Sequence, residues 1–182
     1  MKVANTVDLK NKTNELLRQV MRGEAVIITY RGKPAASITA LSEEDLEDFV
    51  LEHSPKVRKM IAEAEADRKA GRVIPLETYL AKQRGVSQFT VLLTRVATRD
   101  LDRLSSSDRD QVSRALRTLD EEPMGRPPRI KRLKGFSFPL YRLRSSDYRV
   151  LSRIDEAVVT VMRVINRSEL DRTLRKFRLG QP

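Results

Sequence analysis

The sequence contains no cysteine, no tryptophan and one histidine, His53. Disulfides and thiolate metal ligands are therefore excluded, and a single imidazole is too few for an ordinary zinc site. There is also no apolar run long enough to span a bilayer, and no basic segment followed by an apolar one at the start. We therefore expect a cytoplasmic protein that uses no metal and no cofactor.

Positive charge is abundant and unevenly distributed. The 182 residues include 36 Lys and Arg against 25 Asp and Glu, a formal net charge of +11. Residues 1 to 85 hold 15 basic and 13 acidic side chains, whereas residues 86 to 182 hold 21 and 12. The length allows one large domain or two small ones, and the charge favours the second half as the part that binds a polyanion.

Residues 129 to 154 predict a β-hairpin. Apolar and polar residues alternate over 138 to 144 and over 148 to 154, and Ser145-Ser146-Asp147 between them favours a turn. If the loop leaves an even number of residues unpaired, Arg144 lies opposite Arg149. One face of the hairpin would then enter a core with Tyr141, Leu143, Tyr148, Val150 and Ile154.

The other face of this hairpin is cationic, because Arg142 and Arg153 share it with Arg144 and Arg149. Guanidinium groups directly across a strand pair repel each other, so fold stability does not explain their collection there. An anionic partner, either nucleic-acid phosphate or carboxylates from another protein segment, would offset this repulsion. The alternative is a solvated basic face that keeps a sheet edge from aggregating.

The first half begins with helix and hairpin patterns. Thr6 is a plausible N-cap for one helix of about four turns that ends near Gly23. Two strands, residues 25 to 30 and 33 to 41, follow around a turn at Arg31-Gly32. Ser42 then opens a helix with an apolar stripe of Leu46, Phe49 and Val50.

Ser54 and Pro55 open another helix, which Gly71 closes. Its apolar stripe is too thin for it to be stable alone, so we expect this segment to lie on a partner surface. The apolar residues that would make this contact are Val57, Met60, Ile61, Ile74, Leu76, Tyr79 and Leu80.

The stretch GEAVIITYRGKPAASITAL after the first helix resembles the Phd/YefM family of antitoxins over residues 1 to 85. The resemblance implies a dimeric DNA-binding head and an extension that neutralises a toxin. It places DNA contacts at Lys10 and Arg31, with Lys2, Lys12 and Lys33 nearby. Many relatives carry two consecutive arginines in the strand turn, where this chain has Tyr30 and Arg31. A solvated basic helix face is the alternative for these residues.

A strand at 89 to 94, two helices, the hairpin and an apolar strand at 157 to 165 follow, with a basic helix expected from 169 to 179. With the motifs KRLKG, YRLR and DYRVL, this order resembles the RelE/ParE toxin family over residues 88 to 179. We therefore expect an α+β chain. Its parts would be a dimerising Phd/YefM-like head (1–53), a toxin-wrapping helical segment and linker (54–87), and a toxin domain of two helices on a mostly antiparallel sheet (88–182).

RelE-type toxins cut messenger RNA with basic residues on the sheet, and the resemblance carries this role to Arg142, Arg149 and Arg167. RNA contacts would come from Lys131, Lys134, Arg144 and Arg153. Guanidinium donors stabilise charge on a phosphate but make poor general bases. Where ribonuclease members have a tyrosine, this chain has Asp171 or Thr173, and the alternation points Tyr148 inward.

Three functions remain open. The chain could be a self-neutralised toxin-antitoxin fusion with a latent ribonuclease, a DNA-binding regulator with an inert toxin fold, or a ParE-like gyrase inhibitor that needs no catalytic base. In each, residues 54 to 84 would obstruct the arginine face, with Glu63, Glu65, Asp67 and Glu77 available to pair with it. This contact could form within one chain or between the two chains of a homodimer.

Overall fold

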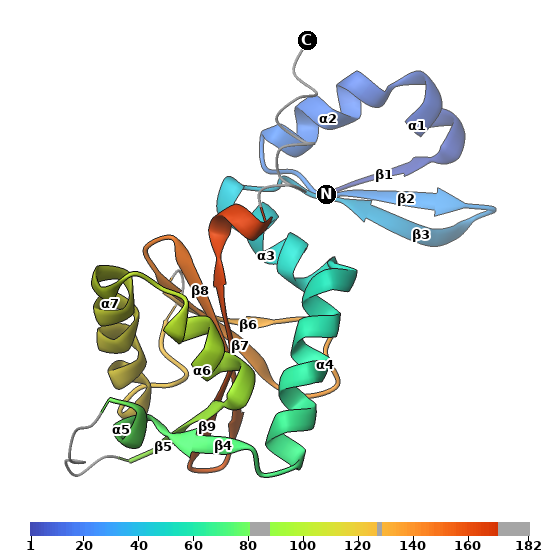
Figure 1. Ribbon diagram of the computed structural model, residues 1–182. Coiled ribbons are helices and arrows are strands. Elements are labelled where there is room, and N and C mark those ends of the chain that lie inside the picture. Colours follow the sequence, from blue (N-terminus) through green and yellow to red (C-terminus); the bar gives the residue numbers. More distant parts are fainter. Residues whose placement is uncertain (81–87, 127–128, 171–182) are drawn as a thin grey trace. The chain divides into compact units, whose positions relative to one another are not determined.

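The computed structural model describes residues 1–80, 88–126 and 129–170 (Figure 1). The chain divides into two compact units, and the division falls between Leu46 and Glu47. Residues 81–87 of the predicted linker and the part of the predicted closing helix beyond Leu170, with Asp171 and Thr173, lie outside the described residues. Among the described residues, no helix combines the length and apolarity that a membrane span requires.

Unit 1 is a three-stranded sheet with two short helices. β1 (Lys2–Asn5) runs parallel to β2 (Val26–Tyr30), which pairs antiparallel with β3 (Lys33–Ile38). α1 (Thr6–Asn11) and α2 (Thr13–Met21) connect β1 to β2. A small core of Ala4, Leu16, Val20, Val26 and Ile28 lies between the helices and the sheet.

The start of the helical segment differs from the sequence prediction in two ways. Asn5, not Thr6, is the N-cap: its side chain accepts the backbone N–H of Asp8, and Asp8 accepts the N–H of Asn5 in return. This reciprocal capping box satisfies two backbone donors that a helix start otherwise leaves open. The predicted single helix is also interrupted at Lys12, so α1 and α2 are separate.

The turn between β2 and β3 lies where the sequence predicts it. Arg31 and Gly32 have φ angles of 50° and 76°, the left-handed conformation that tight two-residue hairpin turns use. Tyr30 pairs with Lys33 across this turn. Arg31 is therefore presented at the exposed tip of the hairpin.

Unit 2 contains a six-stranded sheet in the order β4-β5-β9-β8-β7-β6. β5 and β9 pair in parallel, and every other pairing is antiparallel. The predicted hairpin is confirmed as β7 and β8, with Arg144 paired with Arg149. The strands are β4 (Val73–Pro75), β5 (Thr90–Thr94), β6 (Ile130–Leu133), β7 (Leu140–Ser145), β8 (Tyr148–Asp155) and β9 (Val158–Asn166).

Helices lie on both sides of this sheet (Figure 1). α6 (Arg95–Asp102), α7 (Ser106–Arg117) and the short 3-10 helix Thr118–Asp120 cover one face. Leu143 and Val150 enter the core beneath them, and Tyr141, Tyr148 and Ile154 pack against it. This confirms the predicted alternation of the hairpin. α4 (Pro55–Lys69) lies on the other side and follows α3 (Glu43–His53).

Residues 55 to 80 pass around one edge of the sheet. α4 contacts β9, β5 and α6. β4 then extends the sheet as an edge strand beside β5, and α5 (Leu76–Tyr79) places Leu76 in the core under α6 and α7. The segment that is too polar to fold alone is therefore packed on both faces of the sheet.

Candidate functional site

Strands β6 to β9 gather five basic side chains into what we name the basic cluster: Lys131, Arg142, Arg144, Arg149 and Arg167. Lys131 pairs with Arg142 across β6 and β7, and Arg144 pairs with Arg149 across β7 and β8. Paired residues share a face, so these four lie on the side of the sheet away from α6 and α7. Arg167 directly follows β9.

Asp48 of α3 binds the centre of this cluster. Its Oδ1 accepts Nε of Arg142 at 2.8 Å, and its Oδ2 accepts Nη2 of the same guanidinium at 2.7 Å. Nζ of Lys131 lies 3.1 Å from Oδ2. Arg142 is only 1% exposed, so this two-point pair is removed from water.

Glu47, the preceding residue, occupies the rest of the cluster. Its Oε2 accepts Nε of Arg149 at 2.8 Å and lies 3.8 Å from Nη2 of Arg144. Nε of Arg167 is 3.3 Å from Oε1, an ion pair without hydrogen-bond geometry. Arg149 also donates Nη1 to the carbonyl oxygens of Ser146 and Tyr148. Among the described contacts, two carboxylates therefore meet five cationic side chains.

The carboxylates on these arginines differ from those that the sequence suggested. Glu65 of the predicted wrapping segment does bind a predicted RNA-contact residue, Arg153, at 3.0 Å. Glu63 lies 3.8 Å from Arg163. Asp67 instead binds Arg72, and Glu77 lies in α5. Among the described contacts, the carboxylates on the basic cluster belong to Glu47 and Asp48, which precede the predicted segment.

Glu47 and Asp48 are not expected at the cluster from sequence, because the sequence of α3 predicts a buried face of apolar residues. Of the predicted stripe, Val50 is buried, but Phe49 is 46% exposed and stacks on His53 with ring centroids 4.1 Å apart. The helix also buries Leu51, together with Glu47 and Asp48. A search for apolar residues cannot find such a face, because its burial depends on cations supplied from strands about a hundred residues later.

Arg153 and Lys134 lie outside the cluster. Arg153 binds Asp155 through Nε at 2.6 Å and lies over the ring of Phe138, with its Cζ 4.7 Å from the ring centroid. Lys134 has an exposed side chain, and its backbone N–H donates to Glu52 Oε1 at 2.8 Å. The seven residues predicted for catalysis and RNA contact thus divide into five in the cluster and two beside it.

The predicted neutralising residues make unequal contacts. Val57, Ile61 and Leu76 are buried, and Tyr79 and Leu80 pack against the core under α6 and α7. Met60 lines a pocket of about 230 Å³ with Ile165 and Leu170. Ile74 is 37% exposed and makes the smallest contribution to the packing.

The predicted DNA contacts all lie in unit 1. Lys10, Arg31 and Lys33 are exposed, and Cζ of Arg31 lies 5.2 Å from the centre of the Tyr30 ring. Lys2 pairs with Glu15 at 3.2 Å and Lys12 with Asp8 at 3.3 Å. Exposed pairs of this kind contribute little to stability and exchange readily with solvent.

Tyr148 is poorly placed to act as a general base. Its hydroxyl donates to Asp108 Oδ2 at 3.1 Å, on the core side of the sheet. Burial is the main cause that raises the pKa of Tyr148, and the hydrogen bond to Asp108 acts in the same direction. A phenol with a raised pKa holds its proton near neutral pH, so it does not accept one from a substrate.

The fold combines helices with a mostly antiparallel sheet, and the site lies on a basic face of that sheet. Residues 91–171 match the family described as the ParE toxin of the type II toxin-antitoxin system parDE. This part of the chain is therefore a RelE/ParE-type toxin domain. No curated protein matches the chain.

Three solved complexes resemble the same part of the chain. The archaeal RelE-RelB complex from Pyrococcus horikoshii is 23% identical, with a TM-score of 0.40 over 44% of this chain and 96% of that one. The toxin-antitoxin complex RelBE2 from Mycobacterium tuberculosis is 28% identical, with a TM-score of 0.38 over 44% and 99%. The RelB-RelE complex from Methanococcus jannaschii is 17% identical, with a TM-score of 0.37 over 43% and 93%.

A double-mutant cycle on Asp48 and Arg142 tests the buried pair. Asp48→Ala should lower the free energy of unfolding of unit 2 by about 3 to 5 kcal/mol, because it leaves a buried guanidinium without its carboxylate. Asp48→Ala combined with Arg142→Met should lower it by less than the single change. Urea denaturation measures both. Glu169→Gln, which breaks an exposed pair with Lys56, should change stability by under about 1 kcal/mol, and equal losses in all variants would contradict the buried pair.

Stability at acid pH should report the pairing of Glu65 with Arg68 and Arg153. The hydrogen bond from Arg68 is the main cause that lowers the pKa of Glu65, burial opposes it, and Arg153 adds to the lowering. A lowered pKa contributes stability above the unfolded value, near 4.5, and this contribution is lost as pH falls through the folded value.

Glu65→Gln should therefore destabilise unit 2 by about 1 to 2 kcal/mol at pH 7, and the difference from the natural protein should shrink as pH falls from about 5 to about 3. Urea denaturation at several pH values measures it. Glu63→Gln, at an exposed carboxylate, serves as the control. A difference that stays constant with pH would contradict the assignment.

Proposed function

We propose that this chain is a toxin-antitoxin fusion in which the RelE/ParE-type domain is held inactive by the segment that precedes it. The observation that carries the proposal is the occupation of Arg142 and Arg149 by Asp48 and Glu47. A carboxylate offers two oxygens to the guanidinium fork in the same way as a phosphate does. While these two carboxylates are in place, the basic cluster cannot bind the phosphates of another molecule.

Neutralisation within one chain is the simpler arrangement. Asp48 and Arg142 are 94 positions apart in one polypeptide, and α4, β4 and α5 pack on the same unit that carries the cluster. Covalent linkage gives such contacts an effective concentration on the order of millimolar. Exchange of the segment between two chains is the alternative.

Messenger RNA is the proposed target of the released domain. Cleavage through a 2′-hydroxyl builds negative charge on the phosphate, which Arg142, Arg149 and Arg167 would stabilise. Lys131 and Arg144 would hold the adjacent phosphates. The group that takes the 2′-hydroxyl proton would have to come from the RNA, the ribosome or residues outside the described ranges.

Two alternatives rest on specific observations. The family matched by residues 91–171 is ParE, which favours a ParE-like inhibitor of DNA gyrase that acts by binding alone. The engagement of Tyr148 by Asp108 favours a domain without catalytic chemistry, kept as a platform for a DNA-binding regulator. All three share the same basic cluster and the same in-chain carboxylates, so one set of variants separates them.

Unit 1 is proposed to bind operator-like DNA as a homodimer. Its exposed Lys10, Arg31 and Lys33 would contact phosphates. Its large exposed apolar residues favour self-association, since soluble monomers expose few contiguous ones; they are Met1, Val3, Val7, Leu17, Met21, Tyr30 and Leu41.

Reversing the charge of the two carboxylates should release the toxin. Expression of the full chain with Glu47→Arg and Asp48→Arg should arrest bacterial growth, because the new cations would repel α3 from the cluster. The unchanged chain should be tolerated. Loss of messenger RNA in a translating extract would mark a ribonuclease, and gyrase-linked DNA breaks would mark a gyrase inhibitor.

The matched control reverses two exposed acidic residues in the same unit, Glu63→Arg and Glu169→Arg, and should leave growth normal. Adding Arg142→Ala and Arg149→Ala to the toxic variant should restore growth. A folded Glu47→Arg, Asp48→Arg variant that harms neither cells, RNA nor DNA would exclude a working toxin and leave the inert platform.

DNA binding by the head should depend on salt and on two exposed cations. Lys10→Ala and Arg31→Ala should each weaken binding to the DNA upstream of the coding region. Each should also make the slope of log K against log[salt] shallower by about 1, because one phosphate fewer is neutralised. Fluorescence anisotropy at several salt concentrations measures this. Lys59→Ala, at an exposed lysine of α4, is the control, and equal effects of all three variants would contradict the assignment.

A further inference from the structure

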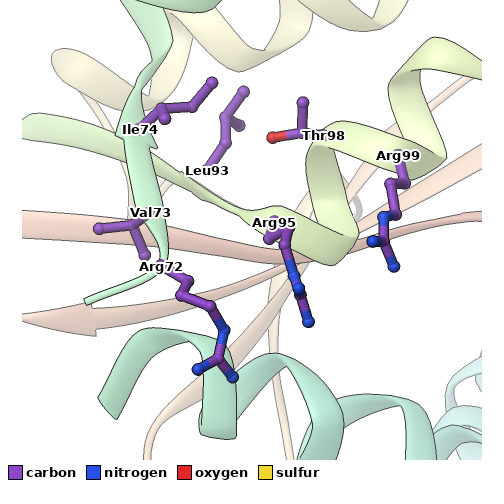
Figure 2. A pocket seen from close by; sticks show the side chains of 7 residues that line it. All are labelled: Arg72, Val73, Ile74, Leu93, Arg95, Thr98 and Arg99. Atoms are coloured by element: carbon purple, nitrogen blue, oxygen red, sulfur yellow. The ribbon is translucent and has the colours of Figure 1, made fainter. Parts of the chain in front are cut away.

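A pocket lies at the edge of the unit 2 sheet opposite the basic cluster, between β4, β5 and the first turns of α6 (Figure 2). Its volume is about 320 Å³, close to the lower end for small-molecule sites. The residues that line it are Arg72, Val73, Ile74, Leu93, Arg95, Thr98 and Arg99. Arg95 N–H donates to the carbonyl oxygen of Arg72 at 3.0 Å, which joins the start of α6 to the start of β4.

The surface of the pocket is almost wholly apolar, and the guanidinium groups of its three arginines lie beside it. Figure 2 shows the guanidinium groups of Arg72, Arg95 and Arg99 extending to one side, with Ile74 and Leu93 on the other. Ile74 is the one large apolar residue of residues 55 to 80 that is more than a third exposed. The apolar pocket would receive a hydrocarbon or aromatic group, and the guanidinium groups beside it would receive an anion.

The cationic side is only partly neutralised. Asp67 is buried, and its Oδ1 lies 2.7 Å from Nε of Arg72 and 3.5 Å from Nη2 of Arg95. Burial works against its ionisation, but Arg72, Arg95 and the N–H of Val96 together lower the pKa of Asp67. Within residues 1–80, 88–126 and 129–170, the three guanidinium groups form no other ion pair. Among the described residues, Arg72 and Arg95 thus share one carboxylate, and Arg99 forms no ion pair.

We infer that this pocket binds a small amphipathic anion: an aromatic or alkyl group that carries a phosphate or a carboxylate. The apolar part would lie against Ile74 and Val73. The anion would accept hydrogen bonds from Arg99 and from the terminal nitrogens of Arg72 and Arg95, where a doubly charged group is better matched than a single charge.

The pocket is lined by two parts of the chain, so a ligand bound there would affect the pairing between them. Arg72, Val73 and Ile74 belong to the segment that wraps the sheet, whereas Leu93, Arg95 and Arg99 belong to the toxin domain at residues 91–171. A ligand held by both would bind only while β4 is paired with β5, so it would stabilise that pairing by mass action. If the segment is the inhibitor, as we propose for the function, the ligand reinforces inhibition.

Phenyl phosphate is the probe for binding, and isothermal titration calorimetry on the full chain is the measurement. We expect a dissociation constant on the order of 0.1 to 1 mM, in keeping with the size of the probe. Inorganic phosphate, which lacks the ring, and benzylammonium, which reverses the charge, should bind at least about tenfold more weakly. Equal binding of phenyl phosphate and inorganic phosphate would overturn the amphipathic site.

Variants on one helix locate the site. Arg99→Gln should weaken phenyl phosphate binding by about tenfold, the effect of one charge-assisted hydrogen bond. Arg103→Gln, at an exposed arginine one turn further along the chain, should leave it within about twofold. Methyl resonances of Val73, Ile74 and Leu93 should shift on titration. Unchanged affinity in Arg99→Gln, or shifts confined to other methyl groups, would overturn the assignment.

Hydrogen exchange separates this inference from the proposed function. Saturating phenyl phosphate should slow hydrogen exchange of the β4 amides. The expected factor is about 1 + [L]/Kd, where [L] is the free concentration of phenyl phosphate. Binding at the pocket without slower β4 exchange would contradict the coupling. Both results are independent of toxicity, so an inert toxin domain would leave the pocket standing, and failure to bind would leave the neutralisation proposal standing.

Discussion

The pairing of two buried carboxylates with the arginines of the sheet is the interaction on which the rest of unit 2 depends. Arg142 and Arg149 are 1% and 5% exposed, and removing a charge from water costs several kcal/mol unless a partner and further hydrogen bonds offset it. Asp48 and Glu47 supply those partners. A sheet that collects cations on one face can be covered only by a segment that brings negative charge to the same place.

This requirement explains the path of the chain after residue 46. α3 brings the two carboxylates, α4 adds Glu65 beside Arg153, and β4 with α5 crosses the sheet edge to place Leu76 in the opposite core. The same path places the pocket next to Asp67, where the last turn of α4 meets the first turn of α6. Guanidinium groups outnumber carboxylates among the described residues at this point. Electrostatic pairing holds the segment at one end and apolar packing holds it at the other.

Local sequence patterns predict most of the helices and strands, but they do not predict ion pairs between residues that lie far apart in the chain. The hairpin register that sets Arg144 opposite Arg149 follows from alternation once the loop leaves an even number of residues unpaired, and the Arg31-Gly32 turn follows from glycine. Two errors were local: Asn5 competes with Thr6 as a cap, and Lys12 interrupts the helix. The burial of Glu47 and Asp48 could not be predicted from α3 alone. It requires the positions of arginines that lie far along the chain, although an excess of arginines facing one way was itself a signal that carboxylates were needed.

The most direct test of the neutralised site is the behaviour of individual guanidinium protons. NMR of arginine Nε–Hε groups in the full chain should give resolved, slowly exchanging signals for Arg142 and Arg149, because their Nε–H groups are buried and donate to Asp48 and Glu47. Asp48→Asn should selectively perturb the Arg142 signal. If both protons instead exchange as fast as that of exposed Arg103, the cluster is open to solvent and the segment does not occupy it.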